Sequence, residues 1–81
     1  MTITQRSPGN LSAGQVLDLY FLEARARLIE LAATLDRIDR ADGAAAVHGD
    51  ARLAFIQESL RILQRSEAGR ARAIQELYSL R

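Results

Sequence analysis

Apolar residues recur at alternating intervals of four and three positions through residues 17–38, an unbroken pattern of three heptads. This spacing places them along one stripe of an α-helix, as in a coiled-coil seam. Beyond the first turn no glycine or proline interrupts the pattern until Gly43, a residue suited to the left-handed position that ends a helix. We therefore predict a long helix over residues 13–42. Its first apolar face comprises Leu17, Phe21, Ala24, Leu28, Leu31, Leu35 and Ile38.

The start of this helix carries its own signals. Ser12 and Gln15 have the spacing of a capping box, in which each side chain binds the backbone N–H of the other residue. Leu11 and Val16 flank the cap at the spacing of a hydrophobic staple. The preceding residues 1–10 are polar and end in turn-forming residues, so we expect a disordered N-terminal tail there.

Two shorter helices are predicted after a connector over residues 43–50. Asp50 is a suitable N-cap for a helix over residues 51–65, and a third helix is expected over 67–80. Ser66 and Gly69 favour a break between them, whereas the apolar positions on either side stay in phase and would also suit one bent helix. We predict a break or kink between 66 and 69.

A second apolar stripe lies almost opposite the first on the long helix. This second apolar face comprises Leu19, Leu22, Ala26, Ile29 and Ala33. A helix that is apolar on two faces must be covered twice, and the returning helices supply one covering. A second copy is the commonest source of the other, so we predict a homodimer that buries the second face.

The predicted fold is all-α: a single domain over residues 11–81, in which the long helix folds back on the second helix and a short third one. Its dimer forms a four-helix type of bundle. This general shape resembles small hairpin proteins that dimerise into four-helix bundles, a resemblance of architecture that carries no function. A monomeric three-helix bundle, with the last helix on the second face, is the alternative.

The composition excludes several classes of functional site. The 81 residues contain no cysteine, which excludes disulfides and thiolate metal sites, and the formal net charge is only +1. Neither a phosphate-binding loop, a nucleophile elbow nor a metalloprotease motif occurs. We expect no cofactor and regard an enzyme as the weaker interpretation. Without a signal peptide or a membrane-length apolar run, the chain is interpreted as a soluble cytoplasmic protein.

Carboxylates on the long helix suggest an alternative function. Glu23 and Glu30 share a strip of the helix, and carboxylates from facing helices hold metals in some bundles. Those bundles also use a Glu-x-x-His pair, which this chain lacks, and its single histidine, His48, lies in the connector. Because Glu23 and Glu30 are also at salt-bridge spacing from Arg27, an ion-pair ladder is the competing interpretation.

A third hypothesis rests on a basic cluster formed by Arg61, Arg65, Arg70 and Arg72. In a helix-turn-helix protein, arginines at the start of a recognition helix contact nucleic acid. The near-neutral net charge weighs against this function. The sequence therefore favours a small self-associating structural, adaptor or regulatory protein, with metal binding and nucleic-acid binding as alternatives.

Overall fold

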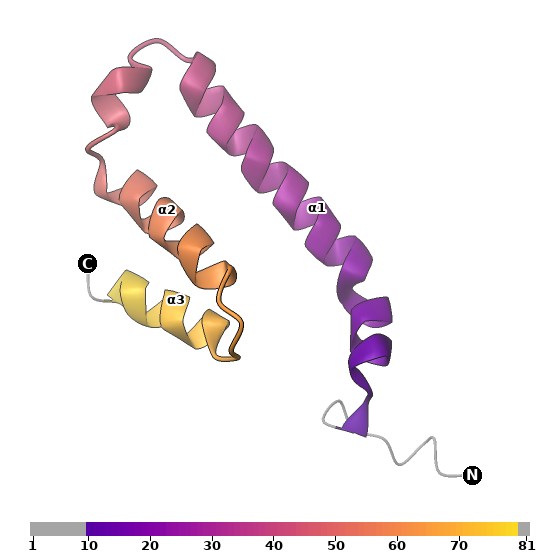
Figure 1. The fold of residues 1–81 in the computed structure, drawn as a ribbon. Coiled ribbons are helices and arrows are strands. Elements are labelled where there is room, and N and C mark those ends of the chain that lie inside the picture. Colours follow the sequence, from indigo (N-terminus) through magenta and orange to yellow (C-terminus); the bar gives the residue numbers. More distant parts are fainter. Residues whose placement is uncertain (1–9, 80–81) are drawn as a thin grey trace. The chain divides into compact units, whose positions relative to one another are not determined.

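Helices form the fold in a computed structural model that describes residues 10–79 (Figure 1). The elements are α1 (Ala13–Arg40), a 3₁₀-helix (Ala44–Val47), α2 (Ala51–Leu63) and α3 (Arg70–Ser79), and no strand occurs between residues 10 and 79. The predicted all-α class is confirmed. Apart from Asn10, the predicted tail lies outside the described residues. The chain divides between Arg40 and Ala41 into two units, each of which is described by itself.

The capping box at the start of α1 forms as predicted. The Ser12 Oγ accepts from the N–H of Gln15 at 3.1 Å, and the Gln15 Oε1 accepts from the N–H of Ser12 at 2.9 Å. The backbone oxygen of Ser12 accepts a further hydrogen bond, from the Val16 N–H at 3.0 Å. These bonds satisfy backbone groups that a bare helix end leaves unpaired, and so they fix where α1 begins.

The other end of α1 lies at Arg40, two residues before the predicted end at Asp42. Arg37 and Arg40 occupy the last turn, where positive charge interacts favourably with the helix dipole. Gly43 adopts a left-handed conformation with φ of 81°, which a side chain would disfavour, and the chain then winds into the 3₁₀-helix. The predicted role of Gly43 in ending the helix agrees with this geometry, although the last helical turn stops earlier.

Asp50 caps α2 and also holds the side chain of Arg52. Its Oδ1 accepts from the Arg52 N–H at 2.8 Å, which confirms the predicted N-cap. The Arg52 Nε and Nη2 donate to Oδ1 and Oδ2 at 3.0 and 2.9 Å. This hydrogen bonding, together with the negative charge of Asp50, raises the pKa of Arg52. One carboxylate thus stabilises both the helix end and a guanidinium.

The predicted break between the second and third helices is present. α2 ends at Leu63 and α3 begins at Arg70, after the predicted start at residue 67. Gly69, directly before α3, has a left-handed φ of 95° that a residue with a Cβ adopts only under strain. Gly69 rather than Ser66 therefore sets the start of the third helix.

α3 runs back alongside α2, so residues 51–79 form a short helical hairpin (Figure 1). The rings of Phe55, in the second turn of α2, and Tyr78, in the last turn of α3, meet edge to face with centroids 5.4 Å apart. Contact between the start of one helix and the end of the other makes the pair antiparallel. The apolar positions that are in phase across the break therefore belong to two adjacent helices, not to one extended rod.

α2 contains two buried apolar residues, Leu53 and Ile62, and one buried polar group without a partner. Phe55, Ser59 and Ile62 follow at i, i+4 and i+7, which places Ser59 on the face of α2 that contacts α3. The Ser59 Oγ is buried and has no hydrogen-bond partner within the described residues. An unpaired buried hydroxyl lowers stability, because water satisfied it in the unfolded chain.

Replacing this hydroxyl should make the protein more stable. We expect Ser59→Ala to raise the free energy of unfolding by about 1 kcal/mol, through removal of the unpaired group and a better helix propensity. Urea unfolding of the full chain, followed by circular dichroism, measures the change. Gln57→Ala, at an exposed position of α2, is the control for propensity alone and should gain less than about 0.5 kcal/mol. A loss of stability in Ser59→Ala would show that the hydroxyl has a partner in solution.

Candidate functional site

The second apolar face of α1 is exposed in the single chain. Its large side chains keep much of their surface in contact with solvent: Leu22 is 75%, Leu19 63% and Ile29 52% exposed. Ala26 is also exposed, and Ala33 is half-buried. The five predicted interface residues thus lie on one face of one continuous helix, as their spacing required.

The first apolar face differs between its two ends. Leu17, Phe21 and Leu28 are exposed, whereas its last three members are half-buried, namely Leu31, Leu35 and Ile38. No residue of α1 is fully buried. Both faces therefore retain apolar surface that a folded protein normally covers.

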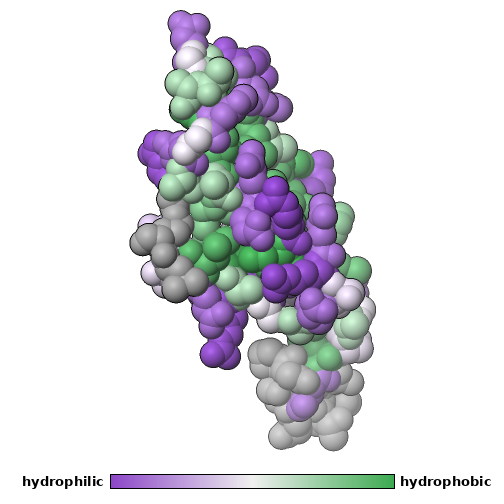
Figure 2. All heavy atoms as spheres, turned by 60° about the vertical axis from the view of Figure 1, so that its left-hand side comes forward, coloured by the Kyte–Doolittle hydropathy of each residue, from purple (hydrophilic) through white to green (hydrophobic). Residues whose placement is uncertain are grey.

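This exposed apolar surface is concentrated in one short segment of α1, which the spacing of the two stripes did not predict. Residues 16–22 contain a single polar residue, Asp18, and all six apolar side chains of the segment are large and exposed. Two of them, Val16 and Tyr20, lie outside the stripes on which the faces were defined. The segment is therefore apolar around nearly its whole circumference, which is typical of a helix that is covered from more than one side. In the space-filling view, green hydrophobic residues reach the visible surface between purple hydrophilic ones (Figure 2).

The polar strips between the two faces carry one internal ion pair. Arg27 Nη2 lies 2.6 Å from Glu23 Oε2 at i,i+4 spacing, which confirms this rung of the predicted ladder. Both side chains are exposed, so the pair contributes only a few tenths of a kcal/mol, about 0.3–0.5, to the helix. Its main consequence is that the charge of Glu23 is compensated within its own helix.

The residues of the metal hypothesis are not gathered into one cluster. Among residues 10–79 no three His, Cys, Asp or Glu side chains lie close enough together to hold a metal ion. Glu23 is engaged by Arg27, and Glu30 lies on the same strip of α1. His48 is exposed and follows the 3₁₀-helix in the other unit.

Three of the four arginines of the basic cluster, Arg61, Arg70 and Arg72, have partners for their side chains. Arg61 pairs with Glu58 at 2.7 Å and Arg72 with Glu76 at 3.1 Å. Arg70 donates from Nε and Nη2 to the backbone oxygen of Arg65, at 2.9 and 2.5 Å. This bidentate contact ties the start of α3 to the segment after α2, so Arg70 acts as a clamp of the turn. This contact could not be predicted from the sequence, because the acceptor is a backbone oxygen five residues away.

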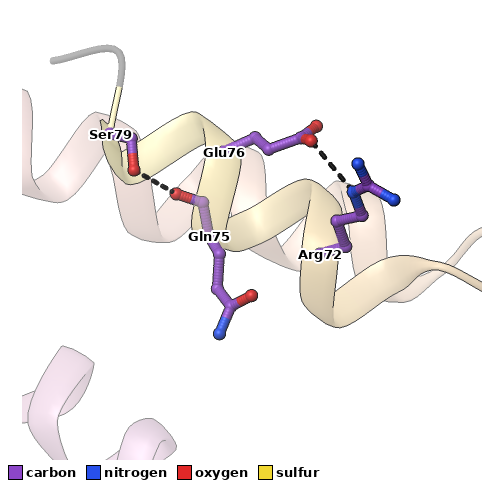
Figure 3. A pocket seen from close by; sticks show the side chains of 4 residues that line it. All are labelled: Arg72, Gln75, Glu76 and Ser79. Carbon is purple, nitrogen blue, oxygen red and sulfur yellow. Dashed lines mark hydrogen bonds and ion pairs between the residues drawn. The ribbon is translucent and has the colours of Figure 1, made fainter.

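A shallow groove on α3 also involves this cluster (Figure 3). It is lined by Arg72, Gln75, Glu76 and Ser79. The ion pair between Arg72 and Glu76 occupies one side, and the Ser79 Oγ donates to the Gln75 backbone oxygen at 3.0 Å on the other. The side chains of Arg72, Glu76 and Ser79 are thus bonded within their own helix, and the four lining side chains do not converge on a common point (Figure 3).

Comparison of the chain with models of known protein families, with curated proteins and with solved structures finds no match. Within the part of the chain that the structure describes, no helix combines the length and the hydropathy needed to cross a membrane. The most extensive candidate site is therefore the exposed apolar surface of α1.

The clamp by Arg70 gives a matched pair of substitutions. Arg70→Ala removes two charge-assisted hydrogen bonds from a half-buried site, so we expect it to lower the free energy of unfolding by about 1–2 kcal/mol. Arg72→Ala removes only an exposed ion pair. Once the higher helix propensity of alanine is allowed for, it should lower the free energy of unfolding by less than about 0.5 kcal/mol. Urea unfolding of both variants measures the difference. Equal losses would contradict the clamp.

Proposed function

We propose that this protein is a small self-associating structural, adaptor or regulatory module that acts through protein–protein contacts in the cytoplasm. In this proposal residues 11–81 form a single domain. The C-terminal helices fold back along the first apolar face of α1, and the second face binds a second copy of the chain. The dimer is a four-helix type of bundle that presents its remaining surface to other proteins.

The observation that carries the proposal is the exposed apolar surface of α1. Among the described residues of its own unit, α1 is accompanied by no second α-helix that could cover the two faces. Burial of apolar surface is the dominant favourable contribution to folding and to most association. A 28-residue helix with two apolar faces therefore needs partners from outside its own unit.

The length of the elements supports a second copy as one of these partners. α1 has 28 residues and spans about 42 Å at 1.5 Å per residue, whereas α2 has 13 residues and spans about 20 Å. Because α3 turns back along α2, it does not extend that length. One short hairpin is too small to cover both faces of α1 along their whole length.

The second face offers a gross hydrophobic gain on association. Full burial of a Leu or Ile side chain contributes about 1.5–3 kcal/mol. Two copies each of Leu22 and Ile29 therefore offer roughly 6–12 kcal/mol before the entropy of association is subtracted. Ala26 and Ala33 are small enough to let two helix backbones approach closely.

Charges placed on the second face should separate the copies. We expect Leu22→Glu combined with Ile29→Glu to give particles with the mass of one chain, or to prevent folding, because four carboxylates would be buried in the dimer. Sedimentation velocity and circular dichroism distinguish these results. Thr34→Glu adds a carboxylate to α1 outside both faces and should keep the wild-type mass. A double variant with wild-type mass and helicity would contradict the proposed interface.

A charge on the first face should instead damage folding within the chain. Leu31 is half-buried on that face, so Leu31→Glu is expected to lower the free energy of unfolding by about 2 kcal/mol or more. Thermal unfolding measures this, with Thr34→Glu again as the control. An unchanged melting temperature would show that the first face is not covered by the chain itself.

A further inference from the structure

We propose that the two α1 helices of the dimer run parallel and in register, with Arg25 of each copy paired to Glu30 of the other. This inference rests on the proposed function, since it concerns the orientation of the same dimer. In this arrangement the second apolar face binds a second copy of this chain in one defined orientation. Three features of α1 support it: the unlike chemistry of its two ends, the placement of its flanking charges, and the partners those charges have within the helix.

The two ends of α1 differ strongly in polarity. Residues 16–22 expose six large apolar side chains, whereas residues 36–40 contain four charged side chains around Ile38. A parallel pair brings the two apolar ends together and leaves both charged ends at the same tip.

An antiparallel pair has two registers with four apolar layers. One sets Leu19 against Ile29 and Leu22 against Ala26, and it places Arg25 opposite Arg25 and Glu23 opposite Glu23 of the other copy. The other sets Leu22 against Ala33 and Ala26 against Ile29. That register places Leu19 of one copy opposite Asp36 of the other, which buries a carboxylate against an apolar side chain.

Arg25 and Glu30 lie on opposite flanks of the second apolar face. They are five positions apart, and in a parallel coiled-coil pair a residue on one flank meets the residue five positions later on the other flank of the partner helix. Arg25 of one copy therefore faces Glu30 of the other. Twofold symmetry forms the same pair a second time.

Neither charge is satisfied by a side chain of its own helix. The residues three and four positions from Arg25 are all apolar: Phe21, Leu22, Leu28 and Ile29. The arginine nearest to Glu30 in the helix is Arg27, and its guanidinium is bonded to Glu23 at 2.6 Å. α1 thus carries an arginine and a glutamate at the edges of the second face that its own sequence does not pair.

Contacts between like charges also differ between the two orientations. In the parallel pair, Asp36 faces Asp36 of the other copy at the charged tip. Asp18 approaches Glu23 of the other copy, where the charge of Glu23 is already compensated by Arg27. In the second antiparallel register described above, Glu23 faces Glu30 of the other copy twice, and Arg25 faces an alanine. Like charges at these positions destabilise a helix pair, so the charge pattern favours the parallel dimer.

Distances between spin labels on the full chain test the orientation. Because the chain has no cysteine, Ala13→Cys or Asp39→Cys carries one nitroxide, near one end of α1 or the other. In the parallel dimer both labelled variants should give distances below about 30 Å, from helix spacing and label length. In either antiparallel register the helix rise separates each pair by about 35–45 Å along the axis. Long distances in both variants overturn the orientation alone, whereas absence of dipolar coupling overturns the dimer and the orientation with it.

Charge reversal gives a second test with a different readout. In the parallel dimer, Arg25→Glu and Glu30→Arg should each raise the dissociation constant roughly 5- to 30-fold, and the combined variant should return it to within about 3-fold of wild type. In the second antiparallel register Glu30→Arg would face Glu23 and tighten the dimer, which overturns the proposal. Arg72→Glu in α3 makes the same change of charge as Arg25→Glu away from α1 and should leave the dissociation constant unchanged. Circular dichroism verifies that each variant keeps its helix content.

Discussion

The need to cover α1 governs the rest of this structure. A helix in water gains little from its own hydrogen bonds, and most helical stability in proteins comes from packing of an apolar face. α1 has two such faces, and through residues 16–22 its apolar surface extends around nearly the whole helix. The capping box fixes where this helix begins, but it supplies no contacts for the side chains that follow. The function of the protein therefore depends on what lies against both faces.

Local features could be predicted from the sequence because they depend on residues close together in the chain. The Ser12–Gln15 box, the Asp50 cap and the Glu23–Arg27 pair each form between residues two to four positions apart. The break before α3 was also predictable, since Gly69 tolerates a left-handed φ that other residues disfavour. The five residues of the second face were found by their spacing, and the helix places them along one stripe as that spacing demands.

Features that depend on contacts between helices could not be predicted in this way. In-phase apolar positions are compatible with one bent helix and with two adjacent helices, and the contacts between α2 and α3, including that of Phe55 with Tyr78, show that α3 turns back. The clamp by Arg70 depends on the path of the turn that brings the Arg65 oxygen within reach. The buried hydroxyl of Ser59 likewise follows from the face of α2 that contacts α3.

The direction taken by α3 also strengthens the case for self-association. Had the second and third helices formed one rod, they would have approached α1 in length and could have covered more of it. As a short hairpin whose first helix has 13 residues, they are less than half as long as the 28-residue α1. The most direct measurement is sedimentation equilibrium of the wild-type chain at tens of micromolar. The account predicts a mass about twice the 9.0 kDa of one chain, and a mass of 9.0 kDa at every concentration would contradict it.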